Sequence, residues 1–391
     1  METITPKLLN WASDVEPDTL AQARRTSELP FVQPHLALMP DAHLGKGATV
    51  GSVIPTERAI IPAAVGVDIG CGMIAVRSQF SGEELRARAA ATGGLSGLRE
   101  AVERAVPLSA GARNTRVLPS AEPRIAELEA MAQRDYAAVL AHWALQLGSL
   151  GSGNHFIEVT LDEAGAVWCF LHSGSRGIGN KLAQQHIAVA RRLAERARLD
   201  LPDADLAHLT EGTAEFDAYL RDLQWAQHFA LLNREEMMDR LVACLAEFMG
   251  ADVVEHERIN CHHNFTRPER HFGRDLWISR KGAIQAEAGQ PGLVPGSMGT
   301  ASYVVRGLGN ELSMNSSPHG AGRRLSRTRA RRTFTGAQLR EAMAGIEYRD
   351  TDAFLDEHPL AYKDVDRVMA DAADLVEVVH VLRQVVNVKG D

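Results

Sequence analysis

The chain has few cysteines and no long apolar run, and both absences narrow the class of protein. Only four of its 391 residues are cysteine, at the widely spaced positions 71, 169, 244 and 261. This number and spacing do not form a disulfide framework, so a reducing cytoplasm is the expected location. No stretch reaches the roughly 18 apolar residues of a membrane span. The N-terminus also lacks the charged start and apolar run of a secretory signal.

Linkers, low-complexity tracts and internal repeats are absent as well. At about 100–200 residues per domain, the length would suggest two or three domains. The reactive motifs described below, however, come from both halves of the chain. A single large domain over residues 1–391 is therefore the better interpretation.

An excess of positive charge is also missing, since the formal net charge is −8. The total alone does not indicate a nucleic-acid binder, but the distribution of charge matters more. The run RRLSRTRARR at residues 323–332 concentrates six arginines shortly after His319. A solvated helix face is one interpretation. Its position beside a candidate nucleophile favours a groove for a phosphate backbone.

Helical and strand-like patterns are interleaved without the regular spacing of a doubly wound sheet. Helices are expected at 18–27, 81–105, 121–147, 177–198, 213–249, 335–344 and 363–375, the second beginning with a capping box at Ser81–Glu84. Strands are expected within 36–75, on both sides of Asp162–Gly165 as a hairpin, and at 252–265, 274–284, 302–309 and 383–389. The Gly/Pro-rich stretch 289–303 is expected to be an irregular binding loop. The fold class is α+β, with mixed β-sheets flanked by helices.

Five short segments, most of them framed by glycine, each hold a residue that can ligate a metal or act as a nucleophile. They are VGVDIGCGM, GSGNHFIE, LHSGSRG, NCHHNF and SSPHGAGRR. Glycine beside a reactive side chain lets the backbone approach a phosphate or adopt a positive φ. One Asp, one Cys and several His describe a site for a borderline metal such as Mn²⁺ or Zn²⁺.

Within these segments, Asp68 and Cys71 lie three residues apart, where they could grip a metal or simply be a turn Asp and a buried Cys. His155 and His172 begin and end the expected hairpin, so they could lie side by side. His262 and His263 compete for the next position. Alternation along a strand would separate His155 from the face that carries its neighbours, so a bend at Gly153 or a turn of the loop would be needed.

In this order, the segments resemble the RtcB family of RNA-splicing ligases. MPDAHLGKGATVGSV, RKGAIQAEAGQPGLVPGSMGTASY, AYKDV and NVKGD add to the resemblance, which runs from about Leu36 to Asp391. It implies an RtcB-type fold and a GTP- and Mn²⁺-dependent RNA ligase active in tRNA splicing or RNA repair. Such an enzyme joins RNA 3′-phosphate or 2′,3′-cyclic phosphate ends to 5′-hydroxyl ends through a histidine–GMP intermediate.

The resemblance also implies roles for particular residues. His319 would carry GMP, and Cys71 would bridge two Mn²⁺ ions that are also held by Asp68, His155, His172 and His263. The GMP pocket would contain Asn154, Phe156, Glu158, Asn264, Ser297, Ser302, Gly320, Ala321, Gly322, Arg323, Tyr362 and Lys389. A carboxylate at Glu158 suits guanine, whose N1–H and N2–H₂ groups are donors. The RNA-binding residues are expected to be Asp41, Lys46, Lys281, Arg324 and Arg327. Asp41 could position the attacking 5′-hydroxyl or a metal-bound water, Lys46 and Lys281 could hold RNA phosphates, and Arg324 and Arg327 belong to the basic run at residues 323–332.

Three other classes of function share parts of this pattern. A related enzyme would guanylylate, cap or heal 3′-phosphate ends without sealing them. A thiolate-ligated metallohydrolase of phosphoesters needs the metal residues but leaves His319 and Lys389 without purpose. A non-catalytic RNA-binding scaffold has no use for the Cys/His/Asp cluster. The expected partners are GTP and RNA with the ends named above, with an archease-type activator as a further candidate and no membrane.

Overall fold

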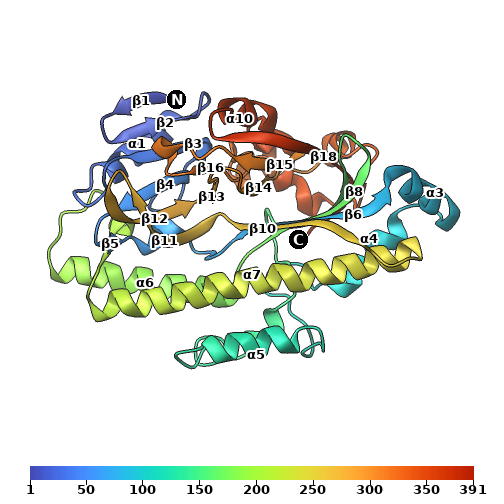
Figure 1. The fold of residues 1–391 in the computed structure, drawn as a ribbon, viewed down its shortest axis with the longest axis horizontal. Helices are drawn as coiled ribbons and strands as arrows, with labels where there is room; N and C mark the ends of the chain where they lie inside the picture. Colours follow the sequence, from blue (N-terminus) through green and yellow to red (C-terminus); the bar gives the residue numbers. More distant parts are fainter.

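Two large β-sheets lie side by side above a pair of long helices in the computed structural model, which describes residues 1–391 (Figure 1). The first sheet has six strands and is antiparallel except where β2 pairs β3. Its order is β1 (Glu2–Thr5), β2 (Leu8–Asn10), β3 (Leu36–His43), β4 (Val50–Thr56), β12 (Arg274–Lys281) and β11 (Asn264–His271).

The second sheet has eight strands, and the last strand of the chain lies in its interior. Its order is β10 (Glu255–His262), β6 (Gly72–Ser81), β8 (Ala166–Ser173), β7 (Phe156–Leu161), β18 (Val376–Val388), β15 (Ser302–Gly307) and β14 (Pro291–Val294). The short β17 (Glu347–Tyr348) pairs with β18 in parallel. Two small ribbons complete the strands, β5 (Ala59–Ile60) with β9 (Leu209–Thr210) and β13 (Ala283–Gln285) with β16 (Ser316–Pro318).

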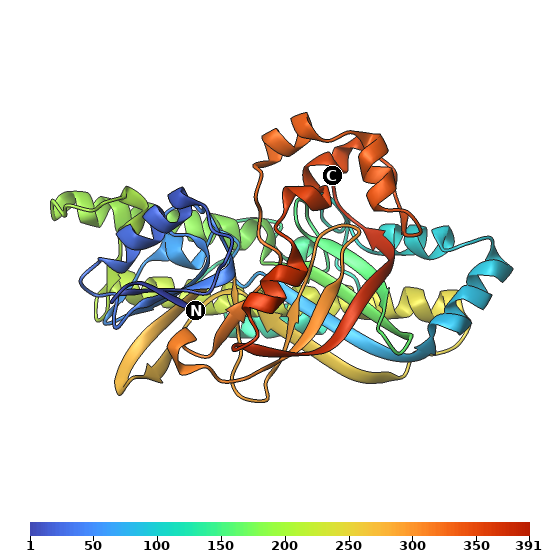
Figure 2. The same cartoon turned by 90° about the horizontal axis from the view of Figure 1, so that it is seen from above.

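Ten α-helices surround these sheets. They are α1 (Pro17–Ser27), α2 (Pro62–Val65), α3 (Gly82–Thr92), α4 (Ser96–Ala105), α5 (Glu122–Met131), α6 (Arg176–Arg196), α7 (Ala214–Met249), α8 (Arg327–Thr333), α9 (Gly336–Ala342) and α10 (Val365–Asp371). Short 3₁₀ turns occur at Ala144–Gln146, Ala204–Leu206, Glu311–Ser313, Asp352–Glu357 and Pro359–Ala361. None of the helices combines the length and the apolar character needed to span a membrane. Seen from above, α8 and α9 belong to a lobe close to the C-terminus (Figure 2).

The strands β6, β8 and β7 of the second sheet are largely buried on both faces, and their side chains alternate between two cores. On β6, Met73 and Ala75 face the core shared with the first sheet, whereas Ile74 and Val76 face the core formed with α4 and α7. Side chains on successive residues of a strand point to opposite faces, so this division extends to β7, β8 and β18. The face turned away from α7 is the one that carries the candidate site.

The structure confirms the α+β class and the hairpin, since β7 pairs β8 with Phe156 opposite His172. The helix expected at 81–105 begins with the predicted capping box but breaks at Gly93, which takes a left-handed φ of 84°, and resumes as α4. The helix expected at 121–147 is wrong beyond Met131. Burial of Tyr136 and Trp143 against Trp225 on α7 replaces the helix there by turns.

The expected irregular loop at 289–303 is only partly irregular. Residues Pro291–Val294 form the edge strand β14, which pairs with β15, so only residues 289–290 and 295–301 of this stretch are without regular structure. Leu293 and Val294 are fully buried in the core between the two sheets. Their burial explains why this Gly/Pro-rich stretch is extended rather than a free loop.

Candidate metal centre and nucleotide pocket

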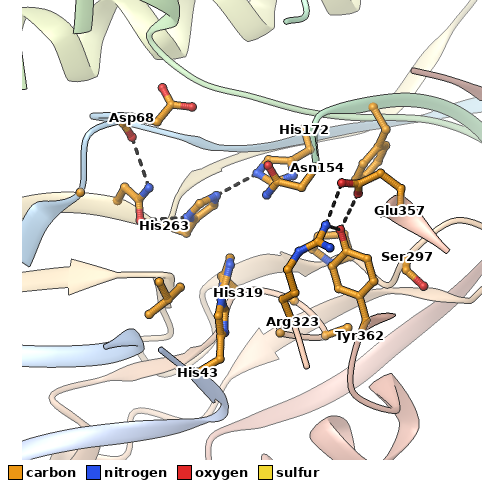
Figure 3. A pocket seen from close by; sticks show the side chains of 18 of the residues that line it. His43, Asp68, Asn154, His172, His263, Ser297, His319, Arg323, Glu357 and Tyr362 are labelled. Atoms are coloured by element: carbon orange, nitrogen blue, oxygen red, sulfur yellow. Dashed lines mark hydrogen bonds and ion pairs between the residues drawn. The ribbon is translucent and has the colours of Figure 1, made fainter. Parts of the chain in front are cut away.

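A cavity of about 370 Å³ lies between the two sheets, and most of the residues singled out in the sequence line it (Figure 3). This volume is within the roughly 300–1,000 Å³ typical of small-molecule sites. One end of the cavity is lined by Asp68, His172 and His263, while Cys71 and His155 contact these residues without lining the cavity themselves. The other end is formed by β7, the end of β18 and the loop that follows β14.

The loop between α2 and β6 places Asp68 and Cys71 at the first end. Asp68 Oδ1 accepts a hydrogen bond from the main-chain N–H of Ser175 at 2.9 Å, and Asp68 Oδ2 lies 3.2 Å from Nε2 of His155. Gly174 has to be glycine at this contact, because a Cβ there would lie 2.3 Å from the Asp68 carboxylate. Cys71 is buried at the start of β6.

Two imidazoles lie against Cys71, and a third extends the cluster. Sγ of Cys71 lies 3.4 Å from Nε2 of His155 and 3.3 Å from Nε2 of His172, which in turn lies 2.9 Å from Nε2 of His263. His155 precedes β7, and Gly153 with φ of 80° makes the bend that brings it beside His172. Of the adjacent pair, His263 joins the cluster, whereas Nδ1 of His262 faces the Gly70 carbonyl at 2.8 Å.

The tautomer of His263 is set by its other ring nitrogen. Nδ1 of His263 lies 3.2 Å from Oδ1 of Asn264, which also accepts from the Gly282 N–H. Since that partner is an acceptor, Nδ1 carries the proton and Nε2 presents a lone pair to the cluster. This is the arrangement that a metal-ligating histidine requires. Nδ1 of His155 lies between the Leu150 carbonyl at 2.9 Å and Nη1 of Arg176 at 3.2 Å.

The charges at the cluster favour a bound cation. Burial, followed by nearby histidine charges, holds the pKa values of His172 and His263 well below their usual range, so both are neutral near pH 7. Burial and then the charge of Asp68 raise the pKa of the Cys71 thiol. Burial opposes ionisation of Asp68, yet its hydrogen bond to His155 outweighs that and lowers its pKa to about 2. A carboxylate, a thiol and lone pairs that face one another fit a divalent cation such as Mn²⁺ or Zn²⁺.

His319 follows β16 and points into the cavity from the wall opposite His172 (Figure 3). Its ring centroid lies 4.6 Å from that of His263. Oδ2 of the fully buried Asp41 accepts hydrogen bonds from the main-chain N–H groups of His319 and Gly320, at 3.1 and 3.2 Å. The same oxygen lies 2.6 Å from Nδ1 of His319, out of line for a hydrogen bond. Nε2 is therefore the free nitrogen of this ring.

The second end of the cavity contains a buried acid and a buried base. Glu158 on β7 and Lys389 after β18 are each less than 5% exposed. Burial raises the pKa of Glu158 to about 8, although Lys389 and Asn387 oppose the shift. Lys389 Nζ donates to the His155 carbonyl at 3.2 Å and lies 3.5 Å from Oε2 of Glu357.

A third group closes this end of the cavity. Arg323 Nη2 donates to the Tyr362 hydroxyl at 2.7 Å and to Oε1 of Glu357 at 2.8 Å, and its guanidinium lies over the Tyr362 ring (Figure 3). The Tyr362 hydroxyl donates to Oε2 of Glu357. Burial opposes ionisation of Glu357, but the charges of Lys389 and Arg323 outweigh it and lower its pKa to about 2.

The structure brings most of the predicted residues to the cavity wall. The lining includes Lys46, Asp68, Asn154, Phe156, Glu158, His172, His263, Asn264, Lys281, Ser297, His319, Gly320, Ala321, Gly322, Arg323, Arg327, Tyr362 and Lys389. Ser302 lies behind the loop, where its hydroxyl accepts from the Gly296 N–H at 3.2 Å.

Two of the residues predicted to contact RNA are buried instead. Asp41 is fully buried against His319 and offers no surface to an RNA chain. Lys281 is 6% exposed, and its ammonium donates to the carbonyls of Lys46 and Ala63. Burial lowers the pKa of Lys281 to about 7. By contrast, Lys46, Arg324 and Arg327 are exposed.

Sequence reasoning missed three residues that the structure places at the site. Glu357 and Asn387 line the cavity; Glu357 lies outside the motifs, and Asn387 begins the NVKGD motif, in which only Lys389 was given a role. Arg234 on α7 is fully buried, and its Nη1 donates to the carbonyls of Gly70 and Ser173, each next to a cluster residue. A signal for Arg234 was present. It lies three residues before the buried Met237 and seven before Leu241, on the apolar face of the helix.

The fold and site together define a mixed α+β protein with a Cys/His/Asp cluster at one end of a nucleotide-sized cavity. The model of the family described as tRNA-splicing ligase RtcB matches residues 22–390 of this chain. The chain therefore belongs to the RtcB family.

Similar proteins include the RNA-splicing ligase RtcB of Escherichia coli K12, which is 47% identical over 96% of this chain and 95% of its own length. The tRNA-splicing ligase RtcB of Pyrobaculum aerophilum is 31% identical over 94% of this chain and 89% of its own length. The RNA-splicing ligase RtcB of Mycobacterium tuberculosis is 30% identical over 89% of this chain and 94% of its own length.

Proposed function

We propose that this chain is an RNA ligase that uses GTP and Mn²⁺ to join RNA 3′-phosphate or 2′,3′-cyclic phosphate ends to 5′-hydroxyl ends. The observation that carries the proposal is the position of His319. Its ring lies between a cluster suited to divalent cations and a pocket with a buried acid and base. Nearly full-length similarity to a relative named as an RNA-splicing ligase supports the same function.

His319 is the proposed nucleophile because its free nitrogen faces the cavity. With Asp41 beside Nδ1, the proton stays on that nitrogen and the Nε2 lone pair is available for attack. Nε2 forms a bond to the α-phosphorus of GTP, and the bond from that phosphorus to the bridging oxygen breaks to release pyrophosphate. The product is GMP attached to His319 through a phosphoramidate.

The cluster residues Asp68, Cys71, His155, His172 and His263 would hold one or two Mn²⁺ ions next to this phosphorus. Bound cations would supply Lewis-acid stabilisation of the negative charge that develops on phosphate oxygens. The protein adds the main-chain N–H groups around Gly320 to Gly322 and the Arg323 guanidinium on the same side of the cavity.

Two further steps complete ligation. An oxygen of the RNA 3′-phosphate attacks the phosphorus of the His319 adduct, which frees the imidazole and leaves GMP on the RNA end through a phosphoanhydride. The 5′-hydroxyl oxygen of the second RNA then attacks the 3′-phosphorus, its proton is lost, and GMP leaves. A cyclic phosphate first has to be opened by water to a 3′-phosphate. The phosphate of the new phosphodiester bond therefore comes from the 3′ end of the RNA, and GMP serves only as the leaving group.

RNA would approach over the basic surface beside the cavity. Arg324, Arg329 and Arg332 are exposed at and next to α8, and Lys46 is exposed at the opposite rim. Arg327 is partly neutralised because it pairs with Asp356 and Glu357. Contacts of this kind to phosphates make binding salt-dependent and independent of sequence.

The test is a pair of assays on the purified chain with Mn²⁺. Incubation with α-labelled GTP should transfer label to the protein, and the label should be acid-labile and alkali-stable, as expected for a phosphoramidate. A 3′-phosphate RNA and a 5′-hydroxyl RNA should then be joined only when GTP is present. An archease-type protein can be added in a parallel reaction to measure whether turnover increases.

The outcomes separate the alternative functions. Label without joining of RNA ends would indicate an enzyme that caps or heals 3′-phosphate ends. Metal-dependent hydrolysis of phosphoesters without label would indicate a metallohydrolase. RNA binding with neither label nor hydrolysis would indicate a scaffold, and the ligase proposal would then be abandoned.

A further inference from the structure

Two buried oxygen atoms at the nucleotide end of the cavity have no hydrogen-bond partner. They are Oε2 of Glu158 and Oδ1 of Asn387. Both residues line the cavity, and each is only 2% exposed. A buried acceptor without a partner costs about 1–3 kcal/mol, so native proteins contain few of them. Two such acceptors on adjacent residues of one wall indicate a ligand that brings donors.

The sheet fixes Glu158 and Asn387 next to each other. β7 and β18 are antiparallel neighbours, and Asn387 lies directly opposite Glu158 in their register. Val386 and Val388 face the core formed with α7, so Asn387 between them faces the cavity. A register irregularity between Gln384 and Val386 sets this orientation, because a slip of one residue would turn Asn387 toward α7.

The amide of Asn387 has one orientation that satisfies its neighbour. Its Nδ2 donates a hydrogen bond to the carboxylate oxygen Oε1 of Glu158 at 2.9 Å. Oδ1 of Asn387 then remains available as an acceptor. Lys389, two residues further along the same face, carries an ammonium that faces the pocket wall near Glu357. The wall therefore presents two acceptors from Glu158 and Asn387 and one donor from Lys389.

This pattern is complementary to the edge of guanine, which has an acceptor at O6 and donors at N1–H and at the exocyclic amino group. The amino group has two hydrogens, and a single carboxylate that also accepts from N1–H takes only one of them. The unpartnered oxygen of Asn387 is placed to take the other.

We propose that Asn387 is a specificity-determining residue of the nucleotide pocket, which holds Glu158 through Nδ2 and accepts the second amino hydrogen of guanine at Oδ1. The inference rests on the proposed function, since it assigns the base of the nucleotide used by the ligase. It predicts that the protein distinguishes guanine from hypoxanthine, which has the same edge without the amino group.

The experiment measures kcat/KM for covalent labelling with GTP and with inosine triphosphate. For the unmodified chain, we expect GTP to be preferred by about a hundredfold, since the inosine nucleotide lacks the amino group and leaves the acceptors on Glu158 and Asn387 without its two donors. Asn387→Ala should reduce this preference by about tenfold, while the contribution of Glu158 remains. The comparison of two nucleotides in two proteins is a thermodynamic cycle, so general damage to the pocket cancels.

Two further variants sharpen the test. Asn387→Asp keeps an acceptor at the Oδ1 position and should retain the preference for GTP, but its second carboxylate facing Glu158 should lower kcat/KM with both nucleotides. Arg383→Ala, at an exposed position on the same strand, is the matched control and should change neither value. Metal content and melting temperature of each variant establish that the fold is intact.

The outcomes distinguish this inference from the proposed function. Equal labelling of the unmodified chain by GTP and inosine triphosphate would overturn the role of Asn387, even if the Ala variant did not fold, and would leave the ligase proposal standing. An unchanged preference for GTP over inosine triphosphate in Asn387→Ala would also overturn the role of Asn387 and leave the ligase proposal standing. Absence of label with either nucleotide would overturn the proposed function and this inference with it.

Discussion

Asp41 and His319, which are 278 positions apart in the sequence, meet at the wall of the cavity through a single oxygen atom. Oδ2 of Asp41 accepts from the His319 N–H at 3.1 Å and lies 2.6 Å from its Nδ1. The carboxylate thus holds both the main chain and the ring of the proposed nucleophile. Its negative charge also stabilises a proton on Nδ1 while Nε2 forms a new bond.

Replacement of Asp41 by Asn tests this relationship. Asp41 contacts the main chain of His319 and Gly320, whereas Asn387 contacts Glu158, so the Asp41→Asn change leaves the proposed guanine contacts intact. The amide keeps an acceptor for the N–H groups but removes the charge, and we expect the rate of labelling by GTP to fall by about ten- to a hundredfold. Asp275→Asn, at an exposed ion pair, is the control and should label at the normal rate. An undiminished rate in Asp41→Asn would show that the charge is not used.

His319→Ala is expected to abolish covalent labelling and to leave the metal content close to that of the unmodified chain. The change removes the nucleophile but none of the cluster residues that converge on Cys71. Labelling is read from the protein band after denaturation, and metal from elemental analysis of the same sample. Persistent label would mean that another residue attacks the α-phosphorus.

Cys71→Ser should sharply reduce Mn²⁺ binding together with all activity. A hydroxyl is a far poorer anionic ligand than a thiolate, and Cys71 lies within reach of both His155 and His172. Cys169→Ser is the matched control, because that buried thiol lies in the core on the α7 side of the sheet. Two metal ions per chain in Cys71→Ser would contradict the assignment.

Arg234→Met is expected to weaken Mn²⁺ binding by about tenfold or more and to lower the free energy of unfolding. The apolar side chain leaves the Gly70 and Ser173 carbonyls without their donor, at about 1–3 kcal/mol for each group, and loosens the loop that presents Cys71 and the end of β8 that presents His172. Calorimetric titration with Mn²⁺ measures the affinity. Arg234→Lys keeps the charge and should restore part of the Mn²⁺ affinity. Equal affinities in the unmodified chain, Arg234→Met and Arg234→Lys would reject this positioning role.

The pH dependence of GTP use should report the ionisation of Glu158. Burial raises its pKa to about 8 in the free protein, whereas guanine donors require the carboxylate. As the pH falls below about 8, the ionised fraction falls about tenfold per unit, so kcat/KM for GTP should decrease in the same proportion. Binding of GTP near pH 7 should release a proton.

Glu158→Gln provides the comparison for that measurement. The amide does not titrate, so the slope of kcat/KM between about pH 6 and about pH 8 should become shallower, and the preference for GTP over ATP should shrink. Metal binding should change little, because Glu158 does not contact the cluster. If ATP labels the unmodified chain as fast as GTP, the guanine assignment of the pocket fails.

The sequence predicted the parts of the site that depend on local composition. Glycine beside Asp68, Cys71 and His319 marked the loops, and the hairpin between His155 and His172 followed from strand alternation on both sides of a short turn. The resemblance to a family selected His263 over His262. That choice agrees with the geometry, because the ring of His262 faces Gly70.

The parts that the sequence did not predict depend on contacts between distant segments. The residues after Met131 have a helical pattern, yet stacking of Tyr136 on Trp225, with ring centroids 3.8 Å apart, favours turns. Asp41 on β3 is buried against His319 and Lys281 on β12 is buried against Ala63, so periodicity within one segment gives no sign of their burial. Asn387 faces the cavity because of a register irregularity in β18, and no local sequence pattern predicts that irregularity.

The interior position of β18 has a consequence for how the protein folds. Because β18 lies between β7 and β15, the second sheet has a gap until residues Val376–Val388 fill it. Asp68, Cys71 and the three histidines around them all precede residue 264, whereas Lys389 follows β18. Pairing over such sequence separations is slow and leaves strand edges exposed in the meantime. The nucleotide end of the cavity therefore depends on the slow insertion of β18 between its two neighbours.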